Sequence, residues 1–381
     1  MRTVRFGDVA SRLNIHVDQD NTNLEYYVGG EHIDSREFLI TKKAPIKGST
    51  IGYQFQFGFR EGDILFMTKN PHLRKCSLVE FDGLCSIATF VIHSNDENIL
   101  LQKYLLLEMQ TDRFWEYCEA HKSGGVNYFI TWGTLSNYIF DIPDIDIQKK
   151  SADKAWAAYE LKLSYRDMIK ATDEMLKSQF IEMFGTLDNH PAEYAVKTLR
   201  DLSECYAGAT PSTKVKEYWD NGSIPWMSSG EVHMEHVTET ESKITESGYQ
   251  QTSTKMVPVH SVVIALAGQG KTRGKVAITE IPLCTNQSLC AIVPSKDIHY
   301  EYLYHNLKGR YLELRGMAGD VNGRGGLNLK IVQSIQVIVP PIDEQMKFVA
   351  IAQQADKSKF ELKQSIEAID KVIKSLINEN L

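Results

Sequence analysis

An internal repeat constrains this chain more than any other feature of its sequence. The segments 141–150 (DIPDIDIQKK) and 338–347 (IVPPIDEQMK) align at an offset of 197 residues and share the pattern Pro-x-Ile-Asp-x-Gln. The register then holds for about forty residues without a gap. The identical pairs include Pro143/Pro340, Ile145/Ile342, Asp146/Asp343, Gln148/Gln345, Lys162/Lys359, Ile169/Ile366, Ala171/Ala368, Asp173/Asp370, Lys177/Lys374, Ser178/Ser375 and Glu182/Glu379. Two unrelated amphipathic helices could share scattered residues, but the common lead-in and the constant register favour a duplication.

Each copy of the repeat predicts a long helix, because apolar residues recur at steps of mostly three and four. The two stripes are Ala152, Trp156, Tyr159, Leu163, Ile169, Thr172, Leu176 and Phe180, and Phe348, Ile351, Ala355, Leu362, Ile366, Ile369, Ile373 and Leu376. An apolar stripe on a long helix needs a partner, and the other copy is the obvious one. The chain direction predicts an antiparallel pair of about thirty residues, roughly 45 Å long, with one β-rich unit at each end.

The segments that precede the helices contain short apolar runs bounded by Gly, Pro and Asn, such as SVVIALAG and SLCAIVP. We therefore predict an α+β fold with a pseudo-two-fold internal repeat. Two β-rich, mixed domains at 1–145 and 186–340 are joined by two coiled-coil-like antiparallel helices at 146–185 and 341–381.

Composition narrows the class of protein. The chain has 381 residues, 43% of them apolar, and a net charge of −7, which argues against a general nucleic-acid coat but not against a local basic site. The six cysteines form no CxxC pair, so we expect reduced thiols. With no apolar leader and no apolar run near ~18 residues, the expectation is a cytoplasmic protein.

The stretch 265–272 (ALAGQGKT) matches a loose P-loop pattern after an apolar run. A P-loop needs its Lys and Thr to open a helix, because the helix N-terminus helps to hold the phosphates. Here Thr272 is followed by RGKVAITEIP, in which Gly274, a β-like Val-Ala-Ile and Pro282 all oppose a helix. We predict a hairpin-like basic loop between two strands and treat a P-loop nucleotide hydrolase as the unlikely alternative.

Several motifs together resemble one family. The stretch 209–232 (ATPSTKVKEYWDNGSIPWMSSGEV) looks like the opening of a target recognition domain in the DNA-specificity subunit of type I restriction-modification systems. GKVAI, CTNQSLCAIV and GGLNLKIVQSIQVIVPPIDEQ continue the resemblance in the same order. The first half is similar more weakly, through VRFGDVASRL, FREGDILFMTKN and IDIQKKSADKAW, and lacks the PST…YW…IPW opening and the TNQS segment.

The resemblance implies a non-catalytic subunit whose two target recognition domains each read half of a split double-stranded DNA sequence. The helices would set the spacing of the half-sites and dock methyltransferase (modification) subunits, with two such subunits expected. The resemblance assigns S-adenosylmethionine to those partners, and ATP and magnesium to restriction (motor and nuclease) subunits that can join. No cofactor is expected on this chain. A DNA-binding adaptor without sequence specificity stays open as an alternative.

Candidate DNA contacts follow from charge and Gly content. The second domain offers an acid-free loop with Gln269, Lys271, Thr272, Arg273 and Lys275, framed by glycines that allow close approach. The equivalent loop of the first domain (67–77) carries Lys69, Asn70, His72, Arg74 and Lys75. The alternative for both is a solvated basic loop.

For the remaining candidates, a purely structural role is supported about as well as a contact with DNA. Ser228 and Ser229 follow Trp226, which is more readily a core residue or a groove wall. Asn286 and Gln287 offer amides for adenine or for a turn. Arg324 lies in a Gly-rich loop (319–328) that resembles a second one at 121–129, and both could close over a DNA backbone or remain flexible. No catalytic triad, metal site, methyltransferase motif or nuclease cluster is recognisable in the sequence.

Overall fold

The computed structural model describes residues 1–268, 270–317 and 326–380. It divides into two compact units: unit 1 comprises Met1–Asp167 and Leu362–Leu381, and unit 2 comprises Met168–Glu361. Helices α5 (Ile145–Phe184) and α11 (Ile342–Asn380) each contribute to both units. They have 40 and 39 residues, more than the thirty on which the estimate of 45 Å rested. No helix within the described residues is long and apolar enough to cross a membrane.

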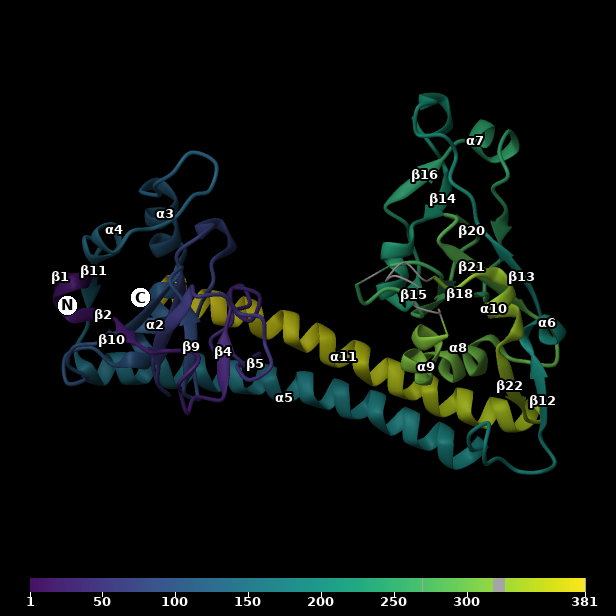
Figure 1. Ribbon diagram of the computed structural model, residues 1–381, viewed down its shortest axis with the longest axis horizontal. Helices are drawn as coiled ribbons and strands as arrows, with labels where there is room; N and C mark the ends of the chain where they lie inside the picture. Colours follow the sequence, from purple (N-terminus) through teal and green to yellow (C-terminus); the bar gives the residue numbers. More distant parts are fainter. Residues whose placement is uncertain (269, 318–325, 381) are drawn as a thin grey trace. The chain divides into compact units, whose positions relative to one another are not determined.

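Unit 1 contains three sheets and short helices (Figure 1). The sheet orders are β1 (Arg2–Arg5)–β11 (Ile139–Ile142); β2 (Ala10–Leu13)–β10 (Thr89–Ser94)–β7 (Ile64–Met67)–β8 (Cys76–Leu78); and β3 (Ile15–His16)–β6 (Phe55–Phe59)–β9 (Gly83–Ser86)–β4 (Tyr26–Val28)–β5 (Ala44–Pro45). The helices are α1 (Phe6–Val9), the 3₁₀ turn η1 (Pro71–Leu73), α2 (Gln102–Gln110), α3 (Asp112–Ala120) and α4 (Trp132–Ser136). All strand pairs are antiparallel except β4 with β9.

Unit 2 repeats this plan (Figure 1). Its sheets are β12 (Ala195–Thr198)–β22 (Gln336–Val339); β13 (Ser203–Ala207)–β21 (Leu289–Pro294)–β18 (Val262–Ala265)–β19 (Val276–Thr279)–β15 (His236–Val237); and β16 (Ser242–Ile244)–β14 (Ile224–Met227)–β20 (Leu283–Thr285)–β17 (Met256–Val257). The helices are α6 (Leu199–Leu202), η2 (Lys216–Tyr218), η3 (Ser229–Met234), α7 (Glu246–Gln250), α8 (Tyr300–Gly309), α9 (Tyr311–Gly316) and α10 (Leu329–Ser334). The pair β14–β20 is parallel, like its counterpart β4–β9 in unit 1.

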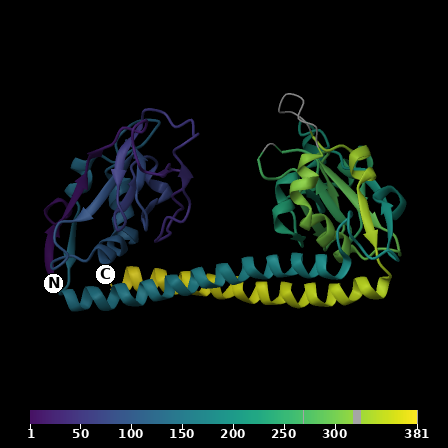
Figure 2. The same ribbon diagram turned by 60° about the horizontal axis from the view of Figure 1, so that its bottom comes forward.

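The apolar stripes of the helices enter the cores. In unit 1, Trp156 of α5 and Ile373 of α11 are buried in one cluster with residues of α2 and α3. In unit 2, the ring of Tyr302 in α8 stacks on Phe180 of α5, and the Phe348 ring of α11 meets Phe180 edge-on. The helices run antiparallel and lie side by side within each unit (Figure 2), as the repeat predicts.

The repeat is visible in individual hydrogen bonds. Gln148 and Gln345 are fully buried and make the same contacts 197 residues apart. The Gln148 amide donates to the carbonyls of Ile99 (2.8 Å) and Pro143 (2.9 Å) and accepts from the Leu101 N–H (3.0 Å). The matching contacts of Gln345 are Asp297 O (3.0 Å), Pro340 O (2.9 Å) and His299 N (2.8 Å). Each Gln thus fixes the start of a long helix against its own β-rich unit.

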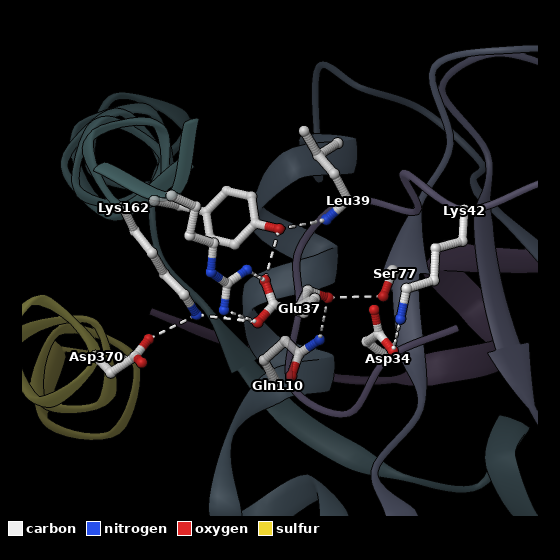
Figure 3. A network of polar contacts seen from close by, with 10 residues as sticks. Asp34, Glu37, Leu39, Lys42, Ser77, Gln110, Lys162 and Asp370 are labelled. Atoms are coloured by element: carbon white, nitrogen blue, oxygen red, sulfur yellow. Dashed lines mark hydrogen bonds and ion pairs between the residues drawn. The ribbon is translucent and has the colours of Figure 1, made fainter. Parts of the chain in front are cut away.

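Reciprocal ion pairs join the two helices. In unit 1, the Lys162 ammonium of α5 lies 2.7 Å from the Asp370 carboxylate of α11 (Figure 3). In unit 2, the Lys359 ammonium of α11 lies 2.9 Å from the Asp173 carboxylate of α5. Both lysines are buried, so each pair selects one register and the antiparallel direction.

Candidate nucleic-acid interface

The loop after β18 is a hairpin connection, not a P-loop. Strands β18 and β19 pair antiparallel, and residues 271–274 form the turn between them. The backbone closes through Gly274 N to Ala265 O (2.9 Å) and Lys275 N to Thr272 O (3.0 Å). Gly274 has a φ of 82°, which favours glycine at this position. No helix begins at Thr272, so the hairpin prediction is confirmed and the phosphate-binding geometry of a P-loop is absent from residues 270–279.

Helix α9 holds this loop in place. The Tyr311 hydroxyl donates to the Lys271 carbonyl (3.0 Å), and the Arg315 guanidinium donates to the Gly270 carbonyl (2.5 Å). A cavity of about 240 Å³ borders the loop, and its lining includes Lys275, His233 and Lys308, the last paired with the Glu235 carboxylate (2.7 Å). The loop therefore presents cations from a fixed backbone.

The predicted contacts in this loop separate into two groups. Lys271 is exposed, and Thr272 and Lys275 are half-buried. Arg273 is only 8% exposed, so its predicted DNA contact would require the side chain to move, and that contact stays a prediction. Gln269 and Arg324 lie outside the described residues.

The loop of unit 1 occupies the equivalent place between β7 and β8, which also pair antiparallel. It contains η1, flanked by Asn70 and Arg74 in the left-handed conformation. Lys69, Asn70 and His72 are exposed. The Arg74 guanidinium pairs with the Asp112 carboxylate, and the Lys75 ammonium donates to the Gly30 carbonyl (2.5 Å). Two of the five predicted contact residues thus also bind groups of the protein.

In unit 1 the structure brings the Gly-rich loop 121–129 beside the hairpin loop, which the sequence did not indicate. In unit 1, Asn70 N donates to Tyr128 O (2.9 Å) and Ile130 N donates to Thr68 O (3.0 Å). In unit 2, Leu327 N donates to Leu266 O (3.0 Å). Unit 1 therefore combines two loops, distant in sequence, into one surface, while in unit 2 the contact concerns Leu327, at the described end of the segment 319–328.

The remaining predicted contacts have structural roles. Ser228 caps η3, where its N–H donates to the buried Glu231 carboxylate (2.6 Å), and Ser229 is the first residue of η3. The Asn286 side-chain oxygen accepts from Ser288 N (3.0 Å), so the turn alternative describes this amide. Gln287 is exposed and accepts from the Thr210 hydroxyl. These contacts leave DNA binding by the four residues an untested prediction.

Each β-rich unit is also tied to a long helix by a titratable side chain, and in each unit this residue follows one with a positive φ. In unit 1, Glu37 follows Arg36 (φ 60°), and its carboxylate accepts from Tyr159 (2.9 Å), Lys162 (3.0 Å) and Arg166 (2.9 Å) of α5 (Figure 3). Burial raises the pKa of Glu37, but the hydrogen bonds and charges of the two basic residues outweigh it and lower the pKa below its usual value.

In unit 2 a histidine makes the contact with a long helix. His236 follows Glu235 (φ 64°), and its ring nitrogens lie 2.7 Å from Glu280 and 3.7 Å from Asp356 of α11. The nearby Asp356 carboxylate, followed by the hydrogen bond and charge of Glu280, raises the pKa of His236 against the effect of burial. The described residues contain no group of His, Cys, Asp and Glu side chains arranged to hold a metal ion.

Residues 191–370 match the family described as "Type I restriction modification DNA specificity domain". The specificity subunit of the type I restriction enzyme EcoR124I/EcoR124II from Escherichia coli is 32% identical over 164 residues, which are 42% of this chain and 40% of that protein. The HindI specificity subunit of Haemophilus influenzae is 20% identical over 453 residues, 98% of this chain and 97% of that one. The first relatives are therefore matched over about 40% of their length.

Two solved structures share the fold. A chain from a study of complex assembly and conformational transition of the type I R-M system has a TM-score of 0.59 at 18% identity, covering 100% of this chain and 98% of that chain. The S subunit of a type I restriction-modification system from M. genitalium has a TM-score of 0.55 at 14% identity, with 100% and 96% covered.

Proposed function

Because this chain belongs to the family of type I restriction-modification DNA specificity subunits, we propose that it reads a bipartite duplex DNA sequence, with one β-rich domain on each half-site. One observation carries the proposal. An acid-free hairpin loop with exposed lysine, Lys69 or Lys271, occupies the same place in both repeats. Cations on two equivalent loops suit two similar segments of phosphate backbone.

We further propose that the chain performs no chemistry itself and docks modification subunits, two in number, in the cytoplasm. Support comes from large apolar side chains that α5 and α11 leave exposed, including Met168 (52%), Phe360 (60%) and Val372 (52%). The repeat supplies two similar helical surfaces, which suits two copies of one partner. S-adenosylmethionine would be bound by these partners, and ATP and magnesium by restriction subunits where they join.

The test begins with the chain produced together with its modification subunit. Mapping methylated bases in the DNA of such cells should yield one split sequence, and a duplex with that sequence should bind the purified complex. Affinity should fall steeply with salt, because bound cations release counterions from the phosphates. Methylation without a common split sequence would favour a DNA-binding adaptor, and flat salt dependence would contradict DNA binding. Retention of nucleotide by the dialysed chain alone would instead favour a nucleotide hydrolase.

A further inference from the structure

Three cations in unit 1 share one carboxylate. Asp112, at the start of α3, accepts from the Arg74 guanidinium, lies 3.5 Å from that of Arg36 and lies 3.6 Å from the Lys374 ammonium of α11. Hydrogen bonding from Arg74, with the charges of Arg74, Lys374 and Arg36, lowers the pKa of Asp112, which therefore stays ionised. Three positive charges facing one negative charge leave a local surplus that suits a second anion.

The backbone holds two of these cations in an unusual conformation. Arg36 and Arg74 have φ values of 60° and 50°, and Arg36 N donates to Arg74 O (3.2 Å). Residues other than glycine rarely adopt positive φ, so the surrounding structure must hold both arginines in this conformation. The result is a pair of guanidiniums that converge on one point from two separate loops.

The cations remain accessible. The exposed fraction of the side chain is 47% for Arg36, 24% for Arg74 and 59% for Lys374. Lys374 is kept near the arginines because its helix, α11, is joined to α3. The side-chain oxygen of Asn378 in α11 accepts from the backbone N–H of Asp112 (2.8 Å). An anion can therefore reach the cluster without unfolding the domain.

We propose that Arg36, Arg74 and Lys374 bind one phosphate of the DNA backbone and that Asp112 occupies these cations when no DNA is bound. The proposal rests on the proposed function, since Arg74 belongs to the hairpin loop assigned to the duplex. Guanidinium groups match the oxygens of a phosphate with paired N–H donors, and the ammonium adds a point charge. The site would bring the helix α11 itself into contact with the DNA of the first half-site.

The test is a double variant, Arg36→Gln with Lys374→Gln, in the complex with modification subunits. The matched control removes two exposed cations of the same unit outside the cluster, Arg60→Gln with Lys371→Gln. Loss of one phosphate contact should reduce the slope of log affinity against log salt by about 0.9. The affinity deficit of the variant should then be about 3.5-fold larger at 50 mM than at 200 mM salt, while the control keeps the wild-type slope.

A third variant separates a binding site from a structural ion cluster. Asp112→Asn removes the competing carboxylate and keeps the backbone bond to Asn378, so DNA binding should tighten about threefold. A wild-type slope in the double variant, or weaker binding by Asp112→Asn, would overturn the site while leaving the proposed function intact. Salt-independent binding by the wild type would overturn both. Melting temperatures identify loss of folding, and the charge-preserving Arg36→Lys with Lys374→Arg should keep the slope.

Discussion

Replacing Glu37 with Gln should destabilise unit 1 and leave unit 2 unchanged. The substitution preserves the shape of the side chain but removes the charge that Lys162, Arg166 and Tyr159 share. The Glu37 side chain is 14% exposed and that of Lys162 is 5% exposed, so water replaces little of the lost interaction.

The structure sets the size of this effect. Removing one partner of a buried ion pair costs about 3–5 kcal/mol. Two features reduce that figure here. Lys162 keeps a second partner, because the Asp370 carboxylate lies 2.7 Å from its ammonium. The Arg166 side chain is 43% exposed, and loss of an exposed ion pair costs about 1 kcal/mol or less. We therefore expect a loss of about 2–3 kcal/mol in the free energy of unfolding, or roughly 4–12 °C in the melting temperature of a unit of this size.

Differential scanning calorimetry can follow the transition of each unit. The control is Asp34→Asn in the same unit, which breaks an exposed pair with Lys42 (2.7 Å) and should cost about 0–1 kcal/mol. Because the pKa of Glu37 is lowered in the folded state, its contribution is present above the ordinary carboxyl pKa and disappears as pH falls through the native value. The variant and the wild type should therefore converge in acid. Equal losses for Glu37→Gln and Asp34→Asn would refute the reasoning.

Three further results are expected. Lys271→Ala should weaken binding to duplexes of any sequence and flatten the salt dependence, as gel-shift titration would show; binding equal to wild type would remove this residue from the interface. Gln148→Ala and Gln345→Ala should each cost about 1–3 kcal/mol in chemical denaturation, in unit 1 and unit 2 respectively, because each leaves one buried and two part-buried backbone groups without their side-chain partner. The pKa of His236 is raised in the folded state by Asp356, so its contribution to the free energy of unfolding is complete below the pKa of histidine in the unfolded chain. That contribution is lost as pH rises through the pKa of the folded state. Chemical denaturation of wild type and His236→Gln from neutral to alkaline pH measures the loss.

The repeat predicted the helices and their partners because it preserves positions that contact each other. Lys162 and Asp173 align with Lys359 and Asp370 at the constant offset, and the structure pairs each lysine with the aspartate of the other helix. Local residue types also sufficed for the hairpin loop, where Gly274 and the following Val-Ala-Ile exclude a helix.

The interface itself needed three-dimensional information. Arg273 is basic and sits in a glycine-framed loop, yet its side chain is buried, and no local pattern reveals which cation of a loop turns inward. Ser228 is an N-cap whose partner, Glu231, follows three residues later, and this Ser-x-x-Glu spacing is the sequence pattern of a capping box. Arg36 escaped notice because its neighbours Arg74 and Lys374 are far away in sequence.

The different partners of Glu37 and His236 have a consequence for how such chains can recombine. The first β-rich domain meets Tyr159 and Lys162 of α5, whereas the second meets Asp356 of α11. In the repeat, Tyr159 aligns with Asp356 and Lys162 aligns with Lys359. A first domain moved to the second position would therefore keep an equivalent lysine but meet a carboxylate in place of the Tyr159 hydroxyl, so the two domains of this chain cannot be exchanged without changing these contacts.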